Sequence, residues 1–146
     1  YRNFGSMTQK GVELGVDSAL TDRVNAYANY SWQGEPEPED FPLSELNIPA
    51  EHRVNVGFNF NVNRLLGSLG VSYASEAFWQ DVLDARYHGE TDAYTLVNGS
   101  IGMRFGARDR IRVMLKGTNL GNQEVQQHIF GDIIKRQFAG ELRINF

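Results

Sequence analysis

The sequence of 146 residues has no cysteine, and this absence excludes disulfide frameworks and thiolate metal sites. It also has no apolar run that approaches the ~18 residues of a membrane-spanning helix, so a helical membrane protein is excluded. The net charge of -4 provides no basic surface for nucleic acid, which is therefore not an expected partner. Proline is scarce, with 4 residues against 15 glycines, and this balance favours strands and tight turns over disorder.

What the sequence does contain is alternation, which is most regular over residues 135–146. From Phe138 onward, every second residue apart from Gly140 is hydrophobic, and the residues between are mostly charged or polar. Because successive side chains of a strand point to opposite faces, this stretch is predicted to be a strand with one apolar and one polar face. It is long enough to cross a bilayer, for which ~9 to 11 tilted residues suffice. We interpret it as the closing strand of an outer-membrane barrel.

The same period of two predicts six further strands. They cover residues 10–20, 23–32, 52–60, 67–75, 93–105 and 110–118. In the strand at 93–105, Tyr94 and Leu96 have the parity of the polar face, so a bulge is expected near its start. The predicted fold class is all-β, an antiparallel up-and-down meander of about seven strands that forms part of a transmembrane β-barrel.

The connections between these strands alternate strictly between short and long. Short connections follow Leu20, Phe60 and Phe105, whereas residues 33–50, 76–92 and 119–133 form long irregular segments. Outer-membrane barrels show this asymmetry, with short periplasmic turns and long extracellular loops. The three long segments are therefore expected outside the cell and the short turns inside.

Aromatic residues occur at both ends of the predicted strands. Rings of this kind are favoured at the depth of the lipid headgroups. The pattern predicts two belts of membrane-interface aromatics: Tyr30, Trp32 and Tyr73 toward the long connections, and Phe60, Phe105 and Phe146 toward the short ones.

Alternation alone leaves open which face meets water. A small outer-membrane barrel or a soluble lipocalin-like barrel, with a binding or structural role, is the alternative. If soluble, it would place the aliphatic face in a core and charged residues such as Glu13, Arg112 and Glu141 in water. An odd number of strands leaves an up-and-down barrel unclosed, whereas bacterial membrane barrels have even numbers. The sequence is therefore expected to be one part of a longer barrel.

Several short motifs resemble the C-terminal β-barrel segment of TonB-dependent outer-membrane receptors. They are Ile48-Pro49-Ala50-Glu51-His52-Arg53 at the start of a strand, Gly117-Thr118-Asn119-Leu120-Gly121-Asn122 at the end of another, and His128-Ile129-Phe130-Gly131 before Arg136. The apolar positions of the last strand look like the assembly signal that the barrel-assembly machinery reads: Phe138, Leu142, Ile144 and Phe146.

This resemblance implies a location in the cell outer membrane, in contact with its lipid. It also implies energy-coupled uptake of a scarce small-molecule nutrient, such as a siderophore or another metal chelate, driven by the TonB complex. Barrels of this family have about twenty-two strands and follow an N-terminal plug and a TonB-binding segment. Residues 1–146 are therefore expected to form the C-terminal portion of such a barrel.

Residues with catalytic or metal-binding chemistry form no recognisable site. His52, His88 and His128 lack the spacing of a metal motif and are interpreted as rim residues. The acidic run from Glu35 to Asp40 contains two prolines and no calcium-loop pattern, so we interpret it as a solvated loop. No nucleophile, base and orienting group can be assembled, and neither an enzyme nor a cofactor is predicted.

Overall fold

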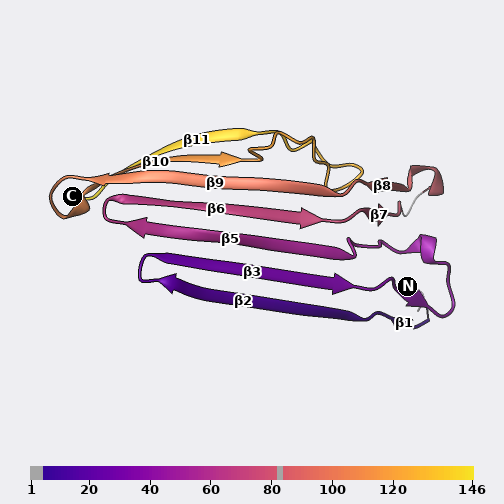
Figure 1. Cartoon of the computed structure of the whole chain (residues 1–146). Helices are drawn as coiled ribbons and strands as arrows, with labels where there is room; N and C mark the ends of the chain where they lie inside the picture. The colour runs from indigo at the N-terminus through magenta and orange to yellow at the C-terminus, as the bar shows by residue number, and fades with distance from the viewer. Residues whose placement is uncertain (1–4, 82–83) are drawn as a thin grey trace.

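The computed structural model describes residues 5–81 and 84–146, and its main element is one antiparallel sheet. Seven long strands lie side by side in the order β11-β10-β9-β6-β5-β3-β2 (Figure 1). Each pairs only with the long strand before or after it in the sequence, so the predicted all-β meander is confirmed. The strands are β2 (Gly11–Thr21), β3 (Val24–Gln33), β5 (His52–Val62), β6 (Leu65–Ala74), β9 (Tyr94–Phe105), β10 (Ile111–Thr118) and β11 (Gln137–Ile144).

One predicted detail is wrong, because β9 has no bulge at its start. The pairing of β9 with β6 runs in unbroken register from Tyr94 opposite Ala74 to Met103 opposite Leu65. Tyr94 and Leu96 therefore lie on the polar face. The Tyr94 hydroxyl accepts a hydrogen bond of 2.9 Å from the Gln127 side-chain amide, so a contact from a loop explains its polar placement. The register irregularity occurs instead between β2 and β3, where it falls at residues 19–21.

The register of the sheet places apolar residues beside apolar residues on one face. Val113, for example, lies between Met103 of β9 and Leu142 of β11, and Tyr30 lies beside Val54 of β5. A shift of one residue would move every side chain of a strand to the opposite face. The alternation in the sequence therefore fixes both the strands and the way they align.

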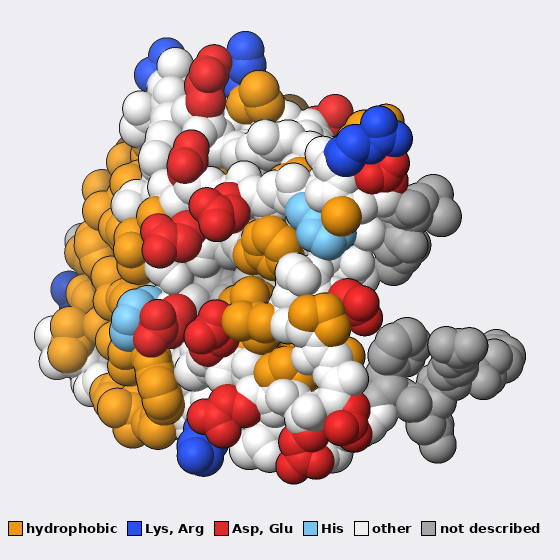
Figure 2. Space-filling view, turned by 90° about the vertical axis from the view of Figure 1, so that its right-hand side faces the viewer, with side chains coloured by type: hydrophobic (Ala, Val, Ile, Leu, Met, Phe, Trp, Pro, Cys, Tyr) orange, Lys and Arg blue, Asp and Glu red, His pale blue; other side chains and the backbone are white. Residues whose placement is uncertain are grey.

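The sheet is a single layer with little core of its own. Among the described residues, the buried hydrophobic side chains are only those of Ala50, Ala74 and Val125. On the apolar face, large side chains remain open, with Leu14 64% and Leu142 65% exposed. Figure 2 looks onto the long-loop end and shows hydrophobic side chains gathered along one flank of the molecule. Apolar surface on this scale indicates a face made for an apolar environment.

Aromatic rings lie over glycines of neighbouring strands on both faces of the sheet. On the polar face, a Cβ added at Gly57 or Gly70 would lie 2.6 or 2.9 Å from the Tyr27 hydroxyl oxygen. On the apolar face, a Cβ added at Gly67 would lie 2.6 Å from Cζ of Phe60. Each ring therefore occupies space that only a glycine leaves free, which helps to hold the strands in register.

Short turns and long loops alternate along the meander, as the sequence predicts. The short turns are residues 22–23, 63–64 and 106–110, and they lie together at one end of the sheet in Figure 1. Asn63 and Gly106 have φ values of 54° and 79°, which are conformations that asparagine and glycine adopt more readily than other residues. The long loops lie at the opposite end.

The long loops contain small elements that the sequence did not predict. β1 (Met7–Thr8) pairs with β4 (Glu37–Pro38), and β7 (Ala77–Trp79) pairs with β8 (Gly89–Thr91). Single 3-10 turns form η1 (Leu43–Glu45) and η2 (Ala85–Tyr87), and a third, η3 (Ala107–Asp109), lies in a short turn. No helix among the described residues is both long enough and apolar enough to cross a membrane.

Candidate functional site

The long-loop end of the apolar face carries an upper aromatic belt, which we define as Tyr30, Trp32 and Tyr73. The Tyr30 hydroxyl and Nδ1 of His52 are 2.9 Å apart, and the two rings stack with their centroids 6.1 Å apart. The Trp32 indole donates a hydrogen bond of 2.8 Å to Oε1 of Glu51. Rings on an apolar face with bonded polar tips match the environment at headgroup depth. His52, predicted as a rim residue, lies in this belt.

The short-turn end of the same face carries a lower aromatic belt, formed by Phe60, Phe105 and Phe146. Phe105 lies opposite Ile111 of β10, and Phe60 packs over Gly67 as described above. Phe146 follows β11 and is fully exposed. These rings have no polar atoms, unlike those of the upper belt. The structure places all six aromatics at or near strand ends, with Phe146 just beyond β11, and their role at a membrane interface stays a prediction.

The strand β11 forms one edge of the sheet and pairs with β10 alone among the described strands. Phe138, Leu142 and Ile144 point to the apolar face and are all exposed. The Arg136 guanidinium lies 5.9 Å from the centre of the Phe138 ring, a cation–π distance. An exposed strand edge with an apolar face has the form of an assembly signal, and that role also stays a prediction.

The three long loops contact one another above the sheet. The ring centroid of His128, in the third loop, lies 4.3 Å from that of Trp79 in the second loop and 5.8 Å from that of Phe130. Ile48, in the first loop, and Phe78 exchange two backbone hydrogen bonds of 2.9 Å. The three long loops are therefore connected to one another and form a single cap.

Asn119 is the residue that holds the third loop together. Its side chain is completely buried, and its Nδ2 donates hydrogen bonds of 2.7 Å to the Gln123 carbonyl and 3.1 Å to the Ile134 carbonyl. Its Oδ1 accepts a bond of 3.2 Å from the Gln123 amide. One side chain thus joins the start of the loop to its end.

Carboxylates gather at this end of the molecule. Most of the 18 acidic residues lie in the three long loops, and Figure 2 shows acidic side chains spread over the loop end. Ser6 and Glu39 form a hydrogen bond there, and the acidic residues of the run from Glu35 to Asp40 are all exposed, as predicted, although the run contains β4. In the part of the chain that the structure describes, no three or more His, Cys, Asp or Glu residues are grouped as a metal site would require.

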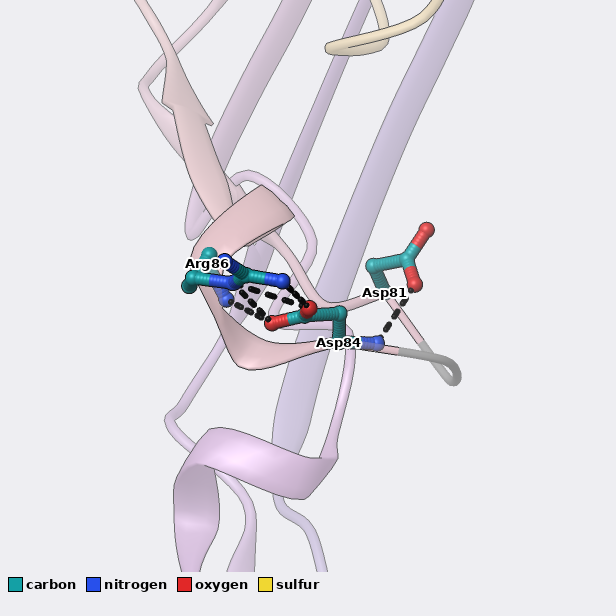
Figure 3. Close-up of polar contacts among 3 residues, drawn as sticks. All are labelled: Asp81, Asp84 and Arg86. Carbon is teal, nitrogen blue, oxygen red and sulfur yellow. Dashed lines mark hydrogen bonds and ion pairs between the residues drawn. The ribbon is translucent and has the colours of Figure 1, made fainter.

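A local ion pair shapes the second loop (Figure 3). Oδ2 of Asp84 lies 2.5 Å from Nη2 of Arg86, and Oδ1 caps η2 by accepting a hydrogen bond of 2.9 Å from the Arg86 amide. The bonds from Arg86 hold the pKa of the Asp84 carboxyl below its usual value, and the carboxylate raises the pKa of the guanidinium. The Asp84 amide also donates to Asp81 at 3.0 Å. Both side chains reach solvent, so the pair acts only within the second loop, and we call it the clip.

Comparison with known proteins adds an independent observation to this geometry. The family model described as TonB dependent receptor-like, beta-barrel matches residues 1–120. The chain belongs to this family. The match includes every long strand from β2 to β10, whereas β11, with the residues predicted as an assembly signal, lies outside it. Searches among curated proteins and among solved structures gave no match.

Membership in the TonB-dependent receptor-like barrel family places the two faces of the sheet in context. The family implies an outer-membrane setting and interaction with TonB, and its members are receptors and transporters rather than enzymes. In a transmembrane barrel the apolar face meets lipid and the polar face lines the interior. We therefore expect the apolar face, with its two aromatic belts, to meet lipid and the polar face to line the interior.

The contacts that sequence reasoning missed are those between segments far apart in the chain. The sequence shows Asn119 only as part of a motif, and it does not predict the pairing of His52 with Tyr30. A signal for the second is present, because Tyr30 and His52 lie near the long-loop ends of neighbouring predicted strands, and they are diagonal neighbours in the register. The burial of Asn119 had no comparable signal.

Proposed function

We propose that the chain forms the C-terminal part of the barrel wall of a TonB-dependent outer-membrane receptor. In this proposal, the receptor takes up a scarce nutrient, such as a siderophore or another metal chelate, at the expense of energy delivered by TonB. The observation that carries the proposal is the form of the sheet, a single layer with one apolar face and with all its long loops at one end. The family match supports it.

Each part of the sheet has a role in this receptor. The aromatic belts anchor the wall at the two headgroup levels, the connected loops face the medium and receive the nutrient, and the short turns face the periplasm. The barrel-assembly machinery reads the apolar positions of β11 and the terminal Phe146. The lipocalin-like alternative is less favoured, because a soluble barrel of this kind would bury its apolar face in its own core.

The uptake proposal is tested by deleting the gene and growing cells with iron supplied as single ferric chelates. We expect one chelate to lose its ⁵⁵Fe uptake in the deletion strain and equally in a strain without TonB. Uptake that needs this protein but persists without TonB would contradict energy coupling. Growth of the deletion strain on every chelate would contradict a metal chelate as the nutrient.

The proposed topology predicts that the loop end and the turn end differ in access from outside the cell. Residues 1–146 contain no cysteine, so Glu37→Cys and Ala107→Cys each add a single thiol to this part of the protein, and the unsubstituted protein gives the background labelling. A membrane-impermeant maleimide applied to intact cells should label the first strongly and the second only after lysis. Equal labelling of both positions in intact cells would overturn the orientation.

A further inference from the structure

The second long loop contains a small hairpin that contacts both of the other long loops. β7 continues beyond β6 after residues 75–76, and β8 leads into β9 through residues 92–93, so the hairpin extends the sheet at its long-loop end (Figure 1). Successive side chains of a strand point to opposite faces, so Phe78 and Trp79 of β7 lie on opposite faces of the hairpin. We call β7 and β8 together the hub.

The first loop joins one edge of the hub through its backbone. Ile48 and Phe78 exchange two backbone hydrogen bonds of 2.9 Å, and the Gln80 amide donates a bond of 3.0 Å to Oδ1 of Asn47. On its other edge β7 pairs with β8. β7 is therefore the middle one of three backbone segments, and the first loop belongs to the same small sheet as the hub.

The third loop packs on the face of the hub that carries Trp79. The ring centroids of Trp79 and His128 are 4.3 Å apart, and the Trp79 indole is fixed by a hydrogen bond of 3.1 Å to Oγ1 of the buried Thr91. Gly89 stands directly opposite Trp79, and a Cβ added there would lie 3.0 Å from Cγ2 of Ile129. The third loop thus contacts both strands of the hub.

The tip of the third loop is itself a well-bonded turn. Nε2 of Gln126 donates hydrogen bonds of 3.1 Å to the carbonyls of Ile129 and Gly131, and the Gly131 amide donates one of 2.8 Å to the His128 carbonyl. These bonds hold His128 and Ile129 in one piece. The two residues therefore dock on the hub, or leave it, together.

We propose that the hub makes the three long loops one cooperative unit, a lid that opens and closes as a whole. The backbone bonds of the first loop and the ring contact of the third loop are made to neighbouring residues of one short strand, Phe78, Trp79 and Gln80. A movement of β7 breaks both sets of contacts at once. Loss of either set lowers the free energy needed to open the other, because the two share the same element.

The test is amide hydrogen exchange of the full-length protein folded into phospholipid vesicles. His128→Ala removes the ring contact of the third loop, and among the described residues the ring contacts of His128 are with Trp79 and Phe130. If the lid is cooperative, exchange of the Ile48 amide in the first loop should rise about threefold or more, which corresponds to one lost ring pair. An unchanged Ile48 amide, with faster exchange confined to residues 126–131, would overturn the proposal.

A matched control removes a contact of the third loop that does not involve the hub. Lys135 and Glu124 form an exposed ion pair of 3.9 Å, so Lys135→Ala should change exchange of the Ile48 amide by less than about twofold. A rise as large as that in His128→Ala would show that any disturbance of the third loop reaches the first loop, and would contradict the role of the hub.

A reciprocal variant examines the same coupling from the first loop. Asn47→Ala removes the bond to the Gln80 amide and should raise exchange of residues 126–131 in the third loop, because coupling between two sites acts equally in both directions. Unchanged exchange there would also overturn the proposal. These rates depend neither on transport nor on which end of the sheet faces the medium, so failure of the uptake or labelling experiments leaves this test intact.

Discussion

The seven-stranded sheet, which we call the wall, and the three connected long loops, which we call the cap, are stabilised in different ways. In the wall, every strand is held by a long ladder of backbone pairs, with a register irregularity at residues 19–21 of β2, and side chains follow one rule, apolar on one face and polar on the other. In the cap, the backbone pairs are few, and single side chains such as Asn119 and Trp79 join segments far apart in the sequence. The wall is therefore set by a pattern and the cap by particular residues.

This difference determines which substitutions each region tolerates. In the wall, the loss of stability caused by a substitution depends on the face of the sheet that carries the residue, and less on the individual contacts of that residue. In the cap, the loss of stability caused by a substitution depends on the hydrogen bonds or ring contacts that are lost. The direction in which the side chain points has little influence on that loss. Pairs of variants, one that keeps the pattern or contact and one that removes it, can test whether the two regions respond differently.

The largest effect is expected on the wall, from Val56→Arg on the apolar face of β5. A charge at mid-bilayer depth on the lipid side of a barrel costs about 2–4 kcal/mol. The matched variant Asn55→Arg adds the same charge one residue away on the polar face, where it should change stability by less than about 0.5 kcal/mol. Denaturant titration of the full protein folded into phospholipid vesicles measures both. Similar losses of stability in the two variants would show that the face of the sheet does not determine the cost of the added charge.

In the cap, Asn119→Ala is expected to cost about 1–3 kcal/mol, because it leaves buried carbonyl groups without their hydrogen-bond donor. Asn122→Ala is the control, since Asn122 has nearly the same φ, 52° against 50°, but is exposed. Hydrogen exchange across residues 119–136 should rise in the first variant alone. If both variants loosened the loop equally, the left-handed backbone and not the buried amide would be responsible.

The smallest effect concerns pH and the clip between Asp84 and Arg86. Because the folded pKa of Asp84 is lowered, the clip contributes fully above the ordinary aspartate pKa and is lost as the pH falls through the lower folded value. Hydrogen exchange of residues 84–91, corrected for its intrinsic pH dependence, should lose protection only in that acidic window. Asp84→Asn should show the lower protection at every pH. A native profile without a step there would contradict the role of the clip.

The wall was predictable from the sequence because alternation is a local property that a single-layer sheet reproduces directly. All seven strands, the sizes of their connections and the placing of Tyr30, Phe60 and Phe105 follow from it. The one wrong detail, the bulge at Tyr94 and Leu96, arose where a loop contact made an aromatic residue favourable on the polar face. In that place, a contact from the cap overrode the pattern of the wall.

The cap was not predictable, because its contacts join residues far apart in sequence without a repeating pattern. The ring contact between Trp79 and His128 and the backbone pairing of Ile48 with Phe78 depend on how the loops fold over one another. Arg112 is an intermediate case. Alternation along its strand places it on the polar face, but only the register shows that it stands between Arg104 and Arg143.

The connectivity of the meander has a consequence for the order in which the wall can form. Among the described residues, every long strand pairs only with the long strand before or after it, so none of these pairings has to wait for a distant part of the chain. Chains with such local pairing fold faster than those that must close large loops first. Each finished hairpin presents an open edge on which the next strand can align, so the wall can grow strand by strand in either direction along the chain.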